Sequence, residues 1–231
     1  PNWKYDAIFD DYYPRDKERI LREHRALTAY TRSNRARAGE ADWNCAQLFT
    51  TASQFLEENR KRENFFLWID CFDPHGPTDC PADYVKLYDD TPGYDGSIDP
   101  RAFCNEVTTN PDLSPPVRKR LRSLYEDKVT FMDKWLGVFL DTLEETGLDG
   151  NTAVILTSDH GTNHDDRADH PFGKTGTVSE NEAHVPLMIS MPGGTSGTAE
   201  ILTQPQDLFA TILSIAGIDR VGDRESYDLN E

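Results

Sequence analysis

The sequence predicts an α/β fold in which helices flank a mostly parallel (mixed) sheet. Two observations support this prediction: apolar runs that end in polar turns, and amphipathic segments that lie between those runs. The run at residues 152–156 is uncharged and mostly β-branched or aliphatic, which is typical of a strand buried on both faces of a parallel sheet. Because open α/β sheets form their sites where such strands end, the polar residues after each run are the first functional candidates.

The remaining elements follow from the spacing of apolar residues, which repeat at three- and four-residue steps in the helical segments. Ser114 and Asp207 are suitable N-caps, and Gly217 is a suitable C-terminal stop. Trp68 and Trp135 are expected to belong to core surfaces. In chain order, the pattern predicts a helix at 42–62, a buried strand at 65–72, a helix at 114–147, the strand at 152–156, a buried strand at 185–191, a short strand at 201–203 and a helix at 207–216.

Composition sets the outer limits on organisation and partners. Residues 1–44 are expected to form a surface helical or loop segment joined to the same domain as residues 45–231. Residues 78–113 are rich in Pro, Gly and Asp and predict a long loop over the sheet edge. The formal net charge of −17 argues against nucleic acid or an anionic membrane surface as the main partner, so an anionic substrate would need local cations or a metal.

Targeting features are few. No apolar run reaches the roughly 18 residues of a membrane span, and the first residues do not form a signal peptide. The chain does not begin with Met, so we expect a piece of a longer protein. Cys71 lies in a predicted buried strand and is expected to be a small hydrophobic residue there. The other three cysteines permit a disulfide without requiring one, and both an extracytoplasmic and a cytoplasmic location stay open.

Polar residues follow two of the predicted strands. An adjacent Asp and His, such as Asp159 and His160, can both reach one metal ion, while Lys174 and His75 could hold and protonate a tetrahedral anion. This set suits the hydrolysis of a sulfate or phosphate ester. The residues concerned are Asp73 and His75 after the first strand, and Asp159, His160, His164, His170 and Lys174 after the second.

Six segments, in their order along the chain, carry a resemblance to a known family. They are FFLWIDCFDPHGP at 65–77, YEDKVTFMDKW at 125–135, TSDHG at 157–161, FGKTG at 172–176, AHVPLMI at 183–189 and QDLFATILSIAGI at 206–218. Together they resemble the second half of the sulfatase catalytic domain, within the alkaline-phosphatase superfamily, over about residues 45–218. The resemblance implies that residues 45–231 form an incomplete α/β domain of this type.

The resemblance also implies roles for individual residues. Asp159 and His160 would be ligands of a divalent cation, calcium first, with magnesium, manganese or zinc as alternatives because many members have Asn where His160 stands. Lys174 would bind the ester oxyanion, and His75 would contact the sulfate or the leaving-group oxygen, with general-acid catalysis as one role. His170 is a further candidate for substrate binding, although the spacing of its loop departs from the commonest family pattern.

Family members carry a first strand with paired Asp ligands and a C/S-x-P-x-R motif whose first residue becomes formylglycine, the nucleophile. None of the four cysteines is followed by that pattern. Residues 114–118 match it superficially, but the Ser-Pro start is the N-cap and first position of a helix. We therefore expect formylglycine in a missing N-terminal half, and we expect this chain alone to be inactive and to bind metal weakly.

Two alternatives stay open beside a sulfatase that cleaves a small-molecule or carbohydrate sulfate ester. One is a phosphodiesterase or phosphonate monoester hydrolase of the same superfamily. Two-zinc phosphodiesterases require an Asp and a His four residues apart. Asp70 and His75 are five residues apart and so miss that spacing by one. The other alternative is a non-catalytic, sulfatase-like binding module.

Overall fold

The computed structural model of this protein describes residues 37–62, 64–76, 78–93, 114–165, 172–174, 176, 178–219 and 226–230. The chain divides into two units. The first unit contains residues 1–148 and 162–177, and the second contains residues 149–161 and 178–231. Residues 1–36, most of the predicted N-terminal surface segment, and residues 94–113 of the predicted loop lie outside the described residues. None of the described helices has the length and apolar content that crossing a membrane requires.

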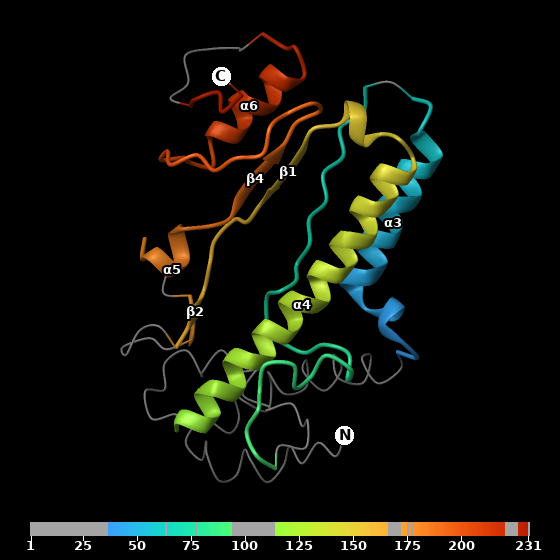
Figure 1. The fold of residues 1–231 in the computed structure, drawn as a ribbon. Helices are drawn as coiled ribbons and strands as arrows, with labels where there is room; N and C mark the ends of the chain where they lie inside the picture. The colour runs from blue at the N-terminus through green and yellow to red at the C-terminus, as the bar shows by residue number, and fades with distance from the viewer. Residues whose placement is uncertain are drawn as a thin grey trace, which may run out of the picture. The chain divides into compact units, whose positions relative to one another are not determined.

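Two long helices form the core of the first unit. α3 (Asn44–Asn59) and α4 (Pro115–Glu145) confirm the predicted helices, and they lie side by side and run in the same direction (Figure 1). Aromatic pairs join them along their length, because Trp43 and Phe49 contact Phe131 and Phe139 with ring centroids 6.0 and 6.2 Å apart. A short 3-10 helix, η1 (Glu40–Asp42), precedes α3.

The buried face of α4 contains charged residues as well as apolar ones. Phe131 and Leu124 are fully buried at its centre, and Asp127 and Lys128 lie between them with only 1% and 3% of their surface exposed. The helix begins as predicted, with Ser114 as N-cap and proline in the first turn. Residues 114–118 are therefore a helix start in this structure.

The segment at residues 65–72 corrects one prediction. It is extended, but it belongs to neither of the two sheets that the described residues form, so the buried strand predicted there is wrong. Its side chains alternate. Phe66, Trp68 and Phe72 are 68%, 68% and 71% exposed, and Asp70 is exposed on the same face. Residues 65, 67, 69 and 71 are half-buried. One face packs on the helices, where Phe65 meets Phe55 at 5.7 Å. Apolar sequence alone predicted burial on both faces, but only one face is covered.

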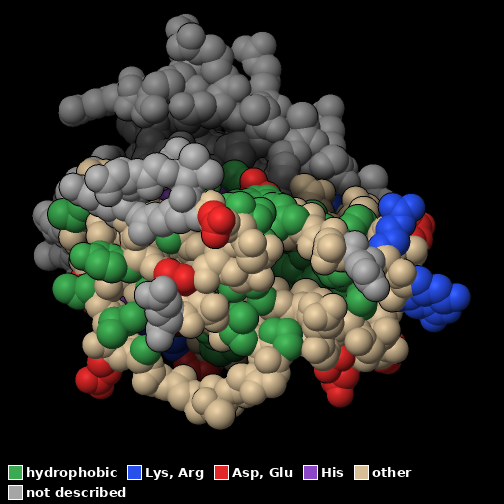
Figure 2. All heavy atoms as spheres, turned by 90° about the horizontal axis from the view of Figure 1, so that it is seen from above, with side chains coloured by type: hydrophobic (Ala, Val, Ile, Leu, Met, Phe, Trp, Pro, Cys, Tyr) green, Lys and Arg blue, Asp and Glu red, His purple; other side chains and the backbone are tan. Residues whose placement is uncertain are grey.

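Exposed hydrophobic side chains are not confined to that segment. Figure 2 shows hydrophobic groups in several places on the face of the molecule that it draws. The correction for Trp68 is direct, because a side chain that is 68% exposed does not belong to a core surface. Trp135 is half-buried on α4, as expected for a residue at the edge of the helix interface.

Both sheets in the described residues are two-stranded and antiparallel, so the mostly parallel sheet is not found there. In the second unit, β1 (Val154–Thr157) pairs with β4 (Leu187–Ser190), and Val154 lies opposite Ser190. In the first unit, β2 (Asn163–His164) pairs with β3 (Phe172–Gly173). The predicted strands at 152–156 and 185–191 thus exist, but they are half-exposed partners of each other, and no strand forms at 201–203.

The second unit also holds a 3-10 helix η4 (Asp149–Asn151), a short α5 (Glu180–Ala183) and α6 (Asp207–Ile215). α6 ends as predicted at Gly217, whose φ of 66° is in the left-handed region that favours glycine. Gln206, not Asp207, occupies the N-cap. The buried carboxylate of Asp207 instead accepts hydrogen bonds from the backbone N–H groups of Gln204 and Tyr227 at 2.7 and 2.8 Å.

The loop at residues 78–93 is fixed to α4 by polar contacts. The carboxylate of Asp127 accepts a hydrogen bond from the backbone N–H of Lys86 at 3.4 Å, and Ser123 Oγ donates to the carbonyl of Tyr88 at 3.1 Å. Arg120 forms an ion pair with the buried carboxylate of Asp89. The loop contains no helix or strand, as its composition predicts.

Asp127 should make stability depend on pH. Burial raises the pKa of its carboxyl from 3.8 to about 6. As pH rises, the unfolded chain therefore loses this proton before the folded chain does. The folded state becomes less stable relative to the unfolded state between the two pKa values. In the unmodified chain, the free energy of unfolding measured by urea denaturation should fall by about 2–3 kcal/mol between about pH 4 and pH 6. We expect this fall to be absent in Asp127→Asn.

Asp133→Asn is the matched control, because Asp133 is an exposed carboxylate on the same helix. It should follow the unmodified chain at every pH. If Asp127→Asn loses as much stability between about pH 4 and pH 6 as the unmodified chain and Asp133→Asn do, burial of the Asp127 carboxyl does not govern the pH dependence.

Candidate active site

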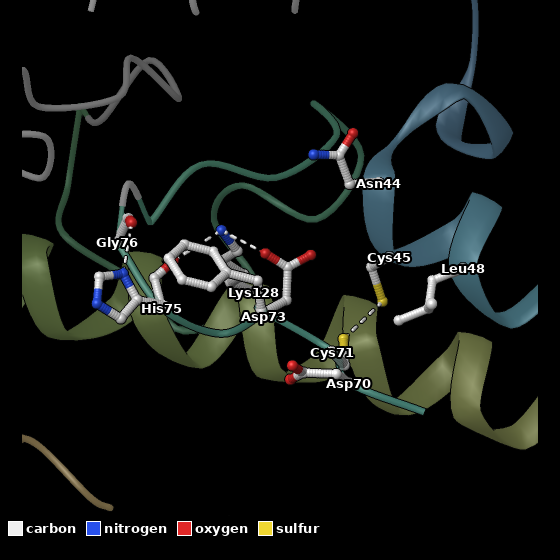
Figure 3. Close-up of a pocket in the computed structure, with 10 residues that line it drawn as sticks. Asn44, Cys45, Leu48, Asp70, Cys71, Asp73, His75, Gly76 and Lys128 are labelled. Carbon is white, nitrogen blue, oxygen red and sulfur yellow. Dashed lines mark hydrogen bonds and ion pairs between the residues drawn. The ribbon is translucent and has the colours of Figure 1, made fainter. Parts of the chain in front are cut away.

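A cavity of about 250 Å³ lies in the first unit where the segment at residues 65–76 passes between the start of α3 and the middle of α4 (Figure 3). It contains His75, one of the predicted site residues. It also contains acidic, basic and thiol groups from three separate stretches of the chain. The residues that line it are Asn44, Cys45, Leu48, Asp70, Cys71, Phe72, Asp73, His75, Gly76 and Lys128.

Lys128 fixes the turn that carries His75. Its ammonium lies 2.7 Å from Asp73 Oδ1 and donates a hydrogen bond to the carbonyl oxygen of His75 at 3.0 Å (Figure 3). The side chains of Lys128 and Asp73 are only 4% and 15% exposed, so this ion pair is largely removed from water. A buried charge is tolerated when it is paired and hydrogen-bonded, and both conditions hold for Lys128.

Sequence reasoning did not select Lys128, although a signal was present. The residue lies four positions after Leu124 and three before Phe131, and both of these are fully buried. A lysine at such a position on an apolar helix face has to find a buried partner. The adjacent Asp127 made burial of Lys128 hard to predict, because two charged residues together suggest an exposed stretch of helix.

The side chains of His75 and Lys174 lie close together. The ammonium of Lys174 is 3.4 Å from His75 Nε2, and His75 Nδ1 is 2.7 Å from the carbonyl oxygen of Gly76. A carbonyl only accepts, so the hydrogen-bond pattern assigns the proton to Nδ1 and leaves Nε2 as an acceptor that faces Lys174. The imidazole also packs on Phe72, with ring centroids 4.4 Å apart.

The position of Lys174 follows from the β2–β3 pair that precedes it. Asn163, which is fully buried, donates from Nδ2 to the carbonyl oxygen of Gly173 at 3.0 Å. Gly173 has a φ of 82°, which turns the chain immediately before Lys174. His164 is a packing residue here, since its ring lies 3.8 Å from the ring of Tyr125. His170 lies outside the described residues.

Asp159 and His160 follow β1 in the second unit, as predicted. Asp159 Oδ2 lies 3.4 Å from His160 Nε2, and Asp159 Oδ1 accepts a hydrogen bond from the backbone N–H of His160 at 2.9 Å. Ser158 Oγ donates to the carbonyl of His160 at 2.9 Å. The two side chains thus present an oxygen and a nitrogen on the same side of the turn, and the Asp159 side chain is 83% exposed.

Gly161 allows this turn to approach α5 closely. Its backbone N–H donates to the carbonyl of Glu182 at 2.9 Å. A Cβ atom at this position would lie 2.1 Å from the carbonyl oxygen of Asn181, a distance that no side chain tolerates. Only glycine therefore permits the contact, and the Asp-His-Gly sequence has a structural reason for its third residue.

The donor set after β1 fits a divalent cation. Two ligands about 2.1–2.4 Å from one ion and roughly 90–110° apart lie about 3.0–3.9 Å from each other, and the measured 3.4 Å falls within this range. In the described part of the chain, no group of three or more His, Cys, Asp and Glu residues could hold a metal ion. Asp159 and His160 therefore offer an oxygen and a nitrogen at a suitable separation, and a complete coordination sphere would need further groups.

His75 and Lys174 are neighbours in the first unit, and Asp159 and His160 are neighbours in the second. The convergence of the two pairs on one site stays a prediction.

Comparison with known proteins decides the family. The family model described as Sulfatase matches residues 4–218. The chain belongs to the sulfatase family. This finding confirms the resemblance carried by the six sequence segments, and it extends the match to residues before the first of them.

Several sulfatases with assigned activities are similar to this chain. An endo-4-O-sulfatase of Bacteroides thetaiotaomicron is 31% identical over 163 residues, which are 68% of this chain and 30% of that protein. An arylsulfatase K of Danio rerio is 30% identical over 112 residues, 48% of this chain and 21% of the relative. A choline-sulfatase of Rhizobium meliloti is 28% identical over 173 residues, 70% and 33% of the two chains. The chain thus matches only a fifth to a third of the length of these relatives.

Removing the charge of Lys128 should destabilise the first unit strongly. In Lys128→Met the carboxylate of Asp73 stays largely buried without its partner, and losing one partner of a buried pair costs about 3–5 kcal/mol. We expect a corresponding loss in the free energy of unfolding measured by urea denaturation. In the double variant Asp73→Asn/Lys128→Met neither charge remains, so part of this loss should be recovered.

The control is Lys119→Met on the same helix. Lys119 is 45% exposed, pairs with the exposed Asp90 and lies 3.9 Å from Asp89. Asp89 keeps Arg120 as its partner, so loss of Lys119 should change stability far less. Equal effects of the two lysine substitutions would contradict the role assigned to the buried pair.

Proposed function

We propose that this chain forms part of the active site of a metal-dependent sulfuric ester hydrolase that cleaves sulfate monoesters. The observation that carries the proposal is the approach of Lys174 Nζ to within 3.4 Å of His75 Nε2. A cation and an imidazole from distant parts of the chain meet there, beside a turn fixed by a buried ion pair. Membership of the sulfatase family supports the choice of a sulfate ester as substrate.

Lys174 binds the anionic head of the substrate. Its ammonium is a compact charge with three donors, which suits the oxygens of a sulfate group. The chain as a whole is strongly acidic, with a net charge of −17, and repels anions at long range. Attraction of the substrate therefore depends on cations placed locally, such as Lys174.

His75 changes its role when an anion binds. In the structure Nε2 is an acceptor that faces the Lys174 ammonium. In the doubly protonated imidazole, Nε2 carries a hydrogen as well as Nδ1. Nε2 then becomes a donor, so His75 can contact a sulfate oxygen or deliver a proton to the leaving-group oxygen.

Asp159 and His160 hold a divalent cation in this proposal. When bound, such an ion stabilises negative charge on the reacting group as a Lewis acid. Asp159 contributes a hard carboxylate oxygen, which suits calcium or magnesium, whereas the His160 nitrogen keeps manganese and zinc as alternatives. Gly161 and α5 fix the turn that presents both ligands.

The rest of the site, including formylglycine, belongs in this proposal to a part of the longer protein that precedes these residues. The exposed face of residues 65–72 supports this view. The exposed face carries Phe66, Trp68 and Phe72, together with Asp70, on an extended segment that pairs with no described strand. Such a face is typical of a sheet strand whose second face and edges are covered by further chain.

The test uses the complete protein that contains this chain. Lys174→Met should lower kcat/KM for an aryl sulfate by about 10²–10³, as expected for losing one donor to a charged reacting group. Lys174→Arg keeps the charge and should retain part of the activity. Lys119→Met is the control and should leave kcat/KM unchanged, since Lys119 forms a surface ion pair with Asp90.

The same assay compares aryl sulfate with an aryl phosphodiester. Preference for the phosphodiester would replace the sulfatase proposal with the phosphodiesterase alternative. Absence of turnover with either ester, in protein shown to carry formylglycine and metal, would favour a non-catalytic binding module.

The 231-residue chain alone should be inactive. It supplies two ligands of the cation and no nucleophile of the expected type, so an aryl sulfate should not turn over at any metal concentration. Calorimetric titration should show only weak calcium binding, and Asp159→Ala should abolish it. Turnover of aryl sulfate that disappears in Asp159→Ala would contradict the proposal that the site is shared with the rest of the protein.

A further inference from the structure

Two thiols face each other in the cavity beside His75. Cys45 lies in the first turn of α3 and Cys71 lies near the end of the extended segment, 26 residues further along the chain. Their Sγ atoms are 4.0 Å apart, and both residues line the same cavity (Figure 3). Cys45 is 1% exposed and Cys71 is half-buried, so Cys71 is the more accessible of the two.

We propose that Cys45 and Cys71 form a reversible disulfide, which makes this cavity a redox-sensitive modification site. A disulfide has an S–S bond of about 2.05 Å, so the two sulfur atoms have to approach by about 2 Å. Rotation about the Cα–Cβ bonds moves a sulfur atom over such a distance, and the cavity provides room for it. The inference rests on these contacts and holds whether or not the chain takes part in sulfate ester hydrolysis.

The chemistry balances with a low-molecular-weight disulfide, such as glutathione disulfide, as oxidant. The Cys71 thiolate attacks one sulfur of the oxidant, forming a mixed disulfide and releasing one thiolate. Cys45 then gives its proton to solvent and attacks the Cys71 sulfur, which releases the second small thiol. Two protein thiols are oxidised to one disulfide, and one small disulfide is reduced to two thiols.

The surroundings favour Cys71 as the attacking residue. The contact between the two thiols lowers the pKa of Cys71 and raises the pKa of Cys45. The thiolate is the nucleophile in exchange, so the more exposed cysteine is also the one prepared to react. Cys80 differs, since burial raises the pKa of its thiol.

The bond would restrain the residues next to the candidate site. Cys71 lies two positions before Asp73 and four before His75. A bond from Cys71 to Cys45 would attach the segment at residues 65–76 to α3. Lys128 already attaches the same segment to α4. The disulfide also closes a loop of chain and so restricts the unfolded state, which should raise the urea midpoint of unfolding.

Peptide mapping of the full 231-residue chain tests the proposal. The chain is equilibrated in glutathione buffers of increasing oxidising power, remaining thiols are alkylated, and peptides are identified by mass spectrometry. We expect two of the four thiols to disappear together, a peptide pair linked through Cys45 and Cys71, and full reversal by dithiothreitol. The variant Cys80→Ser/Cys104→Ser should give the same linked pair.

Two further variants separate this disulfide from other oxidation products. Cys71→Ser and Cys45→Ala should each abolish the linked pair, and neither variant should show the rise in urea midpoint that oxidation gives the Cys80→Ser/Cys104→Ser chain. Recovery of Cys45 and Cys71 as free thiols or as separate glutathione adducts at every buffer ratio would overturn the proposal. Linkage of either residue to Cys80 or Cys104 would overturn it as well.

Discussion

The buried ammonium of Lys128 is the interaction on which the candidate site depends. It lies on the inner face of α4 and satisfies both the carboxylate of Asp73 and the carbonyl of His75. A buried charge is costly unless its partners stay in place. Any movement of the turn at residues 73–75 would leave the Lys128 charge unpaired, so the ion pair holds the turn in position. In the described structure a helix, and not a sheet, therefore positions His75.

The packing of α3 on α4 makes that buried charge possible. Contacts of Trp43 and Phe49 with α4 exclude water from the helix face that carries Lys128. The same logic applies to Lys174, whose backbone is held through the buried amide of Asn163. In each case a polar group that is removed from water fixes the backbone next to a residue that has to meet a substrate. Rigid support of this kind keeps a binding group in position without any contact to the ligand.

Local patterns predicted the helices and the Asp-His turn because each depends on nearby residues. The three- and four-residue steps of α3 and α4 need no knowledge of the rest of the chain. The pairing of β1 with β4 depends on residues 30 to 36 positions apart, and apolar composition says nothing about strand direction. Burial of Lys128 and exposure of Trp68 both depend on which surfaces meet. The sequence pattern therefore favoured a buried Trp68 and did not single out Lys128. Family membership was predictable because the six segments carry it jointly.

Successive side chains of the segment at residues 65–72 point to opposite faces, so contacts on one face affect the other. Phe65 and Cys71 point towards α3, where Phe55 and Cys45 meet them, and these two contacts fix the register of the segment from both ends. Successive side chains of an extended chain point to opposite faces, so a shift by one residue would move the whole set to the other face. Fixing the inner face therefore also fixes the outer row that contains Trp68. A bond between Cys45 and Cys71 would thus act on both faces, stabilising the turn that carries His75 and the apolar surface that the rest of a longer protein would cover.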